Sequence, residues 1–155
     1  MIIAPTSTAT TQRSLPPLSP PLSPRASFRV LQLTDTHLFA QAQETLLGLP
    51  TQLCLQRIID RILNQPQLPD FIVLTGDLSQ DGRAESYANL SALLEPLGLP
   101  IYWIPGNHDC VKTMTRSLQA PIFEPDKRFE YQGWQFILLN SQIPGEDPVV
   151  SAPRS

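Results

Sequence analysis

The stretch FIVLTGD, residues 71–77, decides the fold. Phe71–Leu74 is a continuous apolar run, which is typical of a strand that is buried on both of its faces. The run ends abruptly on Thr75, Gly76 and Asp77, where polar side chains and a glycine replace the apolar ones. This pattern predicts a central strand with a polar cluster at its carboxyl end.

Similar units stand on either side of this stretch. Phe28–Thr34 and Ile101–Ile104 are short apolar runs that also end in polar clusters. Between the first two runs, the sequence predicts a helix with one apolar stripe. We expect Thr51 to be its N-cap and Pro66 to mark its end. That stripe comprises Leu55, Ile58, Ile59, Ile62 and Leu63.

A second helical stripe lies between residue 77 and Ile101. It comprises Tyr87, Leu90, Leu94 and Leu97, and Gly98 and Pro100 end it. Strand, helix, strand, helix, strand predicts an α/β fold with right-handed crossovers and a mostly parallel sheet. Residues 112–118 predict a short helix, and residues 128–131 and 134–139 predict a hairpin around Gln132 and Gly133.

Residues 1–27 have a different composition from the rest of the chain. They hold six of the 17 prolines, are rich in serine and threonine, and carry only two charges, Arg13 and Arg25. Such a segment cannot bury enough apolar surface to offset its ordering entropy, so we expect a disordered tail. We expect a domain over residues 28–147 and a divergent end over residues 148–155.

Charge and apolar patterning exclude several classes of protein. The net charge of −3 argues against nucleic acid as a partner, since a basic surface is absent. No apolar run approaches the length of a membrane span. Two cysteines, Cys54 and Cys110, are too few for a disulfide scaffold and favour reduced thiols in the cytoplasm.

Three polar clusters follow the three predicted strands: residues 35–37 (DTH), residues 76–77 (GD) and residues 106–109 (GNHD). Parallel strands end at one edge of a sheet, so these clusters should meet there. They contain both histidines of the chain. Carboxylate, amide and imidazole donors together suit Mn, Fe, Zn or Co. Two such ions held by a shared carboxylate are a device of phosphoryl chemistry.

Each cluster alone has a plainer interpretation. Asp-x-His after a strand can serve loop solvation or capping, Gly-Asp is a turn signal, and Gly-Asn-His-Asp can form a type I′ turn. Their occurrence at three successive strand ends favours the metal site.

In these motifs the chain resembles the calcineurin-like metallophosphoesterases, whose series begins D-x-H, G-D, G-N-H-D/E. The surrounding text, such as FIVLTGDLSQDG and YWIPGNHD, is most similar to the class III cyclic nucleotide phosphodiesterases. The resemblance covers residues 28 to about 147 and implies the N-terminal part of an αββα sandwich. It implies a cytoplasmic hydrolase with two divalent ions and a small phosphodiester or cyclic nucleotide substrate such as cyclic AMP.

The resemblance also implies roles for individual residues. Asp35, His37 and Asp77 would hold the first ion, and Asp77 and Asn107 the second. His108 would contact the scissile phosphate as a proton donor, and Asp109 would orient His108 by accepting its second ring N–H. His37, Asp77, Asn107 and His108 would thus surround the substrate, and a metal-bridging hydroxide would attack phosphorus.

The family pattern continues with further histidines that this chain does not have. The chain is therefore expected to be C-terminally truncated, to hold one ion rather than two, and to have reduced or no activity. Two alternatives stay open: another calcineurin-like phosphoesterase (a protein phosphatase, nucleotide pyrophosphatase or nuclease), and a non-catalytic fragment.

Deleting residues 1–27 should leave the folding of the remaining chain unchanged, because the segment has no apolar pattern to contribute to a core. Limited proteolysis should cut first between Ser7 and Arg25. Strong protection of this stretch would contradict the expected disorder.

Overall fold

The computed structural model describes residues 27–142; residues 1–26 and 143–155, which include almost all of the expected tail and all of the divergent end, lie outside the described residues. The chain forms an α/β fold with a three-stranded parallel sheet in the order β1-β2-β3. The strands are β1 (Val30–Leu33), β2 (Phe71–Thr75) and β3 (Ile101–Ile104). The predicted central strand is confirmed, since β2 pairs with both neighbours.

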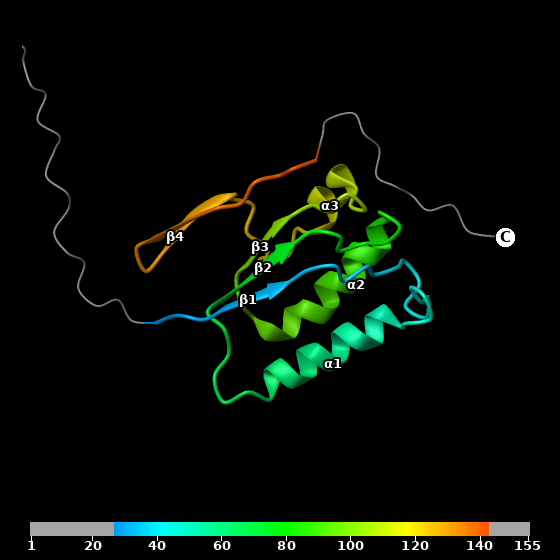
Figure 1. Ribbon diagram of the computed structural model, residues 1–155, viewed down its shortest axis with the longest axis horizontal. Helices are drawn as coiled ribbons and strands as arrows, with labels where there is room; N and C mark the ends of the chain where they lie inside the picture. The colour runs from blue at the N-terminus through cyan, green and yellow to red at the C-terminus, as the bar shows by residue number, and fades with distance from the viewer. Residues whose placement is uncertain (1–26, 143–155) are drawn as a thin grey trace, which may run out of the picture.

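Two helices cover one face of this sheet (Figure 1). These are α1 (Thr51–Leu63) and α2 (Ala84–Leu94), and a short 3₁₀ turn, Glu95–Leu97, extends α2. Gly98 then ends the helix in the left-handed region at φ 61°, as its position in the sequence predicts. A third helix, α3 (Val111–Ser117), follows β3.

The hairpin β4 (Arg128–Tyr131) and β5 (Trp134–Ile137) lies over the opposite face of the sheet (Figure 1). Gln132 and Gly133 both have positive φ, as a type I′ turn requires. Phe71 at the start of β2 packs edge-on against Phe129 and Phe136 of the hairpin. The neighbouring Ile72 belongs instead to the core on the helix side. The prediction that β2 is buried on both faces is therefore confirmed.

Thr51 does not cap α1, so this prediction is wrong. Pro50 occupies the N-cap position without a side-chain hydrogen bond, and Thr51 is the first helical residue. The Thr51 hydroxyl donates instead to the carbonyl oxygen of His37, at 3.1 Å. This bond ties the start of α1 to the segment that follows β1.

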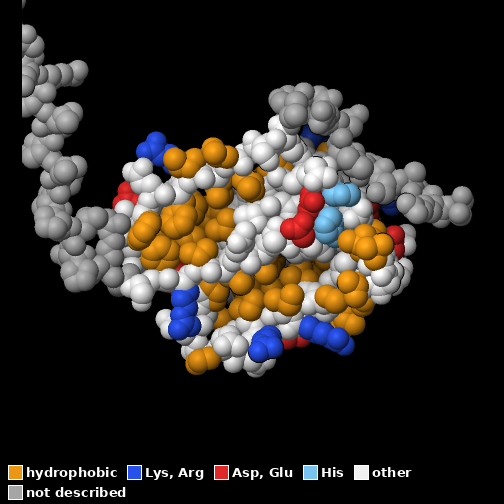
Figure 2. Space-filling model, viewed as in Figure 1, with side chains coloured by type: hydrophobic (Ala, Val, Ile, Leu, Met, Phe, Trp, Pro, Cys, Tyr) orange, Lys and Arg blue, Asp and Glu red, His pale blue; other side chains and the backbone are white. Residues whose placement is uncertain are grey.

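β1 forms the edge of the sheet within the described residues. The outer side of β3 is partly covered, since Ile101 bridges to Phe123, whereas β1 pairs only with β2. Broad apolar areas are visible on this side of the molecule (Figure 2). Apolar side chains of β1 and α1 that are more than two-fifths exposed include Val30, Leu53 and Ile58. No helix in the described part of the chain is long and apolar enough to cross a membrane.

The carboxyl ends of β2 and β3 approach each other through two glycines. A Cβ on Gly76 would lie 2.8 Å from Cα of Gly106. A Cβ on Gly106 would overlap the backbone nitrogen and the Oδ1 of Asp77. No side chain fits at either position, so the glycines permit the approach of the second and third polar clusters.

Gly106→Ala should destabilise the fold by about 1–3 kcal/mol, because the added methyl must push the Asp77 backbone away. It should also lower Mn²⁺ affinity at the predicted site. Denaturant unfolding and Mn²⁺ titration measure the two effects.

Gly98→Ala is the matched control. Gly98 needs a left-handed backbone, but a methyl group added there would meet nothing within 4 Å. The control should cost about 1–2 kcal/mol through its backbone alone and leave Mn²⁺ affinity unchanged. Equal metal affinities for the two variants would contradict the close-approach role of Gly106.

Candidate metal centre

The segments after β1 and β2 continue side by side beyond the ends of the strands. The N–H of Asp35 donates to the carbonyl of Gly76 and the N–H of His37 to that of Asp77, both at 3.0 Å. Leu38 continues the series with a bond to Leu78. The first two polar clusters are therefore fixed relative to each other by backbone bonds rather than by flexible side chains.

Three residues of these clusters adopt left-handed backbone conformations. Asp35, His37 and Asp77 have φ values of 54°, 41° and 51°. For a residue with a Cβ this region costs about 1–2 kcal/mol. Strain of this kind concentrates at functional sites, where the surrounding structure holds it in place. In this structure the left-handed backbone conformation directs the three side chains away from the alternating pattern of a strand and toward one another.

The third cluster reaches the same place through Asp77. The backbone N–H of His108 donates to Oδ1 of Asp77 at 3.0 Å. The rings of His37 and His108 then meet edge to face, with centroids 5.1 Å apart. Histidine and acidic side chains lie next to each other on this face of the molecule (Figure 2).

Nitrogen and oxygen donors converge at this point. One donor atom each of His37, Asp77 and His108 lie within 4.8 Å of one another. Nε2 of His37 lies 3.8 Å from Oδ1 of Asp35 and 4.0 Å from Oδ2 of Asp77. These separations are too long for direct hydrogen bonds. Donors that share an ion at about 2.1 Å stand about 3–4 Å apart, so the spacing suits a cation between them.

A second observation supports a cation here. Nδ1 of His37 is buried and has no hydrogen-bond partner among the described residues, and an orphaned buried polar atom at such a site is accounted for by a bound ion or water. An imidazole beside two carboxylates is the ligand set that Mn²⁺, Fe²⁺ or Zn²⁺ accepts. The residues present therefore fit a divalent metal ion.

Asp109 does not have the contact predicted for it. Its carboxylate, 1% exposed, accepts hydrogen bonds from the backbone N–H groups of Leu78, Ser79 and Gly106 and from the hydroxyl of Tyr87. With these donors it anchors the loops rather than orienting the His108 ring, so the predicted orienting bond is wrong.

Tyr87 is a fixed donor in this arrangement. Its hydroxyl lies 3.1 Å from Oδ1 of Asp109 and accepts the N–H of Cys110 at 3.0 Å. Burial and the neighbouring Asp109 carboxylate raise the pKa of Tyr87 well above its usual range. The hydroxyl therefore keeps its proton and its role as a donor.

The remaining predicted residues lie at the exposed rim of the site. The side chain of Asp35 is 62% exposed and takes a 2.5 Å hydrogen bond from the Thr34 hydroxyl. Asn107 is exposed, in the turn that precedes His108. The structure thus brings His37, Asp77 and His108 together, with Asp35 beside them.

Two residues at the site were not predicted from the sequence. Gln80 places its amide nitrogen 3.4 Å from Nδ1 of His108. Gln142 donates from its amide to the carbonyl oxygens of Gly106 and, at 3.2 Å, of Asp109. Gln80 stands three residues after Asp77 in the same loop, a spacing that could have drawn attention to it. Gln142 is distant in sequence and nothing marks it.

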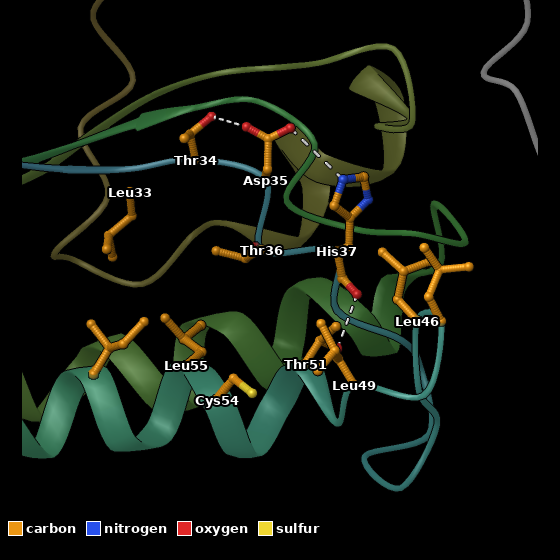
Figure 3. Close-up of a pocket in the computed structure, with 12 residues that line it drawn as sticks. Leu33, Thr34, Asp35, Thr36, His37, Leu46, Leu49, Thr51, Cys54 and Leu55 are labelled. Atoms are coloured by element: carbon orange, nitrogen blue, oxygen red, sulfur yellow. Dashed lines mark hydrogen bonds and ion pairs between the residues drawn. The ribbon is translucent and has the colours of Figure 1, made fainter.

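A pocket of about 290 Å³ opens beside Asp35 and His37 (Figure 3). Its floor and walls come from the end of β1, the first turns of α1 and the intervening loop. The lining is mainly apolar and includes Leu46, Leu49 and the free thiol of Cys54. Of the metal-fitting residues, Asp35 and His37 are part of the lining of this mainly apolar pocket.

Comparison with known proteins identifies the motif series. The family described as calcineurin-like phosphoesterase matches residues 28–150. The 3',5'-cyclic adenosine monophosphate phosphodiesterase CpdA of Escherichia coli K12 is 41% identical over 129 residues, which are 83% of this chain and 47% of that protein. The corresponding CpdA of Pseudomonas aeruginosa is 37% identical over 123 residues, 79% of this chain and 45% of the relative.

A third relative is a 3',5'-cyclic-nucleotide phosphodiesterase of Nostoc, 40% identical over 115 residues, which are 74% of this chain and 43% of the relative. The chain spans about half the length of the curated relatives it matches. Its parallel sheet and separate hairpin are consistent with the N-terminal part of a metallophosphoesterase fold. By its three motifs, their convergence at one sheet edge and these similarities, the chain belongs to the calcineurin-like phosphoesterase family of hydrolases that act on phosphoric esters.

Proposed function

We propose that this chain carries the metal-binding and phosphate-contacting part of a metal-dependent phosphodiesterase that acts on 3',5'-cyclic nucleotides, cyclic AMP among them. The observation that carries the proposal is the convergence of His37, Asp77 and His108 within 4.8 Å. The names of the relatives support the cyclic nucleotide as substrate class.

The carboxylates and His37 supply the metal-binding groups. Asp35, His37 and Asp77 would hold a first divalent ion, manganese, iron or zinc, and both carboxylates lie within 4.0 Å of the His37 ring nitrogen. Asp77 is the group that two ions could share, because it follows the central strand, between the other two clusters, and has two carboxylate oxygens. Asn107, on the exposed turn, would contribute an amide oxygen toward a second ion in the intact family.

A divalent ion held by these groups supplies Lewis acidity, which neutralises charge on phosphate oxygens and lowers the pKa of a bound water. The chain's own residues do the remainder. The loops after β2 and β3 are fixed by the Asp109 anchor, and the segment after β1 is fixed by its backbone bonds to Gly76 and Asp77. The carboxylates and imidazoles therefore need little rearrangement when a phosphodiester arrives. His108 stands beside the metal-binding groups, and its ring N–H can donate a hydrogen bond to an oxygen of the phosphodiester and stabilise the charge that develops there.

The surroundings of the site favour a small substrate over a polymer. The net charge of the chain is −3, which gives no general attraction for a nucleic acid backbone. We assign the phosphate contact to a small set of groups, Asn107 and the two histidines. A compact phosphodiester such as a cyclic nucleotide needs no more than this local set.

Asp77→Asn should lower Mn²⁺ or Zn²⁺ affinity by about 10–100-fold, because it removes the shared negative charge while keeping the size of the side chain. Asparagine also tolerates the left-handed backbone at this position. Calorimetric titration of the metal-free chain with Mn²⁺ measures the loss. Any metal-dependent hydrolysis of cyclic AMP or of bis-p-nitrophenyl phosphate that the unaltered chain shows should be lost in the same variant.

Asp60→Asn is the matched control. Asp60 is exposed on α1, and its side chain takes a hydrogen bond only from Gln56 among the described residues. This control makes the same change of charge and is preferable to Asp81, whose carboxylate accepts the N–H groups of Ala40 and Arg83. Superimposable titration curves for Asp77→Asn and Asp60→Asn would refute the metal site. Metal binding without any phosphodiester turnover would instead assign the chain a binding role.

A further inference from the structure

Among the described residues, Gln80 supplies the polar contact to Nδ1 of the His108 imidazole. The amide nitrogen of Gln80 lies 3.4 Å from this ring nitrogen. Gln80 itself is held firmly, since its backbone N–H donates to the carbonyl of Leu38 at 2.8 Å. The adjacent Ser79 is fully buried and bridges to the same segment. The Gln80 side chain therefore projects from a rigid part of the loop that also carries Asp77.

Asp109 is not available to orient this ring. Its two oxygens already accept four donors, namely three backbone N–H groups and the Tyr87 hydroxyl. An oxygen acceptor near Nδ1 would hold a proton on that nitrogen. An amide N–H instead requires Nδ1 to present its lone pair. The identity of the group facing Nδ1 thus decides which nitrogen of the neutral ring carries the proton.

We propose that Gln80 is a positioning residue for His108, whose amide N–H donates to Nδ1 and holds the neutral ring in the Nε2–H form. In this form Nε2 is a hydrogen-bond donor and has no lone pair to offer a cation. His108 therefore faces an oxygen of the phosphodiester, while His37 and Asp77 bind the metal. The inference rests on the proposed function. His108 lies close enough to bind the metal or to contact the phosphodiester, and the inference assigns it to the phosphodiester.

The direct test is the proton position on His108 in the metal-free chain of 155 residues. The chain has only two histidines, so ¹⁵N-labelled protein gives two ring spin systems. A His37→Asn variant leaves one of them and assigns it. At alkaline pH, where imidazoles are neutral, we expect Nε2 of His108 to show the shift of a protonated nitrogen and Nδ1 that of an unprotonated one.

Gln80→Glu is the decisive variant, because it keeps the shape of the side chain and reverses the hydrogen bond. The carboxylate accepts from Nδ1–H, so the two ring nitrogens of His108 should exchange their shift classes. Nε2 then gains a free lone pair, and Mn²⁺ affinity should rise relative to Gln119→Glu. Gln119 is exposed, and this control adds the same charge elsewhere.

Gln80→Leu covers the case in which the charged variant fails to fold. With no partner on Nδ1, the ring should lose its single proton position and show averaged ¹⁵N shifts. An Nδ1–H ring in the unaltered chain would overturn the inference, and so would a His108 spectrum unchanged by both Gln80 variants. Neither result depends on the Mn²⁺ titration of Asp77→Asn. Failure of this inference and failure of the proposed function are therefore distinguishable.

Discussion

The buried carboxylate of Asp109 is the contact on which the site depends. A carboxylate that is 1% exposed is unfavourable unless its lone pairs are matched by donors. Its donors come from three parts of the chain: the loop after β2, the start of the loop after β3, and α2 through Tyr87. Satisfying one charge therefore fixes the second and third polar clusters against each other and against the helix layer.

Two glycines make this arrangement sterically possible. Gly76 and Gly106 let the loops approach until the Gly106 backbone touches Asp77. The backbone N–H of His108 can then reach the Asp77 carboxylate. The strained φ angles of Asp35, His37 and Asp77 follow from the same demand, because the side chains must leave the alternating pattern of a strand to share one point. Folding of the sheet and the Asp109 anchor offset this local cost.

Much of the fold could be predicted from local pattern. The continuous apolar run at Phe71–Leu74 indicates a strand that is buried on both faces. The apolar stripes that include Leu55 and Tyr87 indicate helices, because a helix with one buried face repeats its apolar residues every three to four positions. The hairpin follows from Gln132-Gly133, whose positive φ values the turn demands. The gathering of the three clusters follows from parallel topology alone, as β1, β2 and β3 end at one edge.

What could not be predicted depends on partners far away in the sequence. Thr51 is a residue type that often caps helices. In the structure its hydroxyl instead donates to the carbonyl oxygen of His37, which folding brings near. Asp109 is adjacent to His108 in the sequence, which favours a contact between their side chains. In the structure the Asp109 carboxylate instead accepts backbone N–H groups about 30 residues earlier in the chain. The spacing of residues along the chain does not show which of several possible hydrogen-bond partners a side chain will contact.

The hydrogen-bond ladder that runs past the ends of β1 and β2 has a consequence for recognition. Asp35 and His37 are paired to Gly76 and Asp77 by the same kind of bond that holds the sheet together. The chain therefore loses the conformational entropy of these residues when it folds, before any ligand arrives. Binding then has little further ordering to oppose it, and more of the intrinsic attraction between ligand and donors remains as affinity.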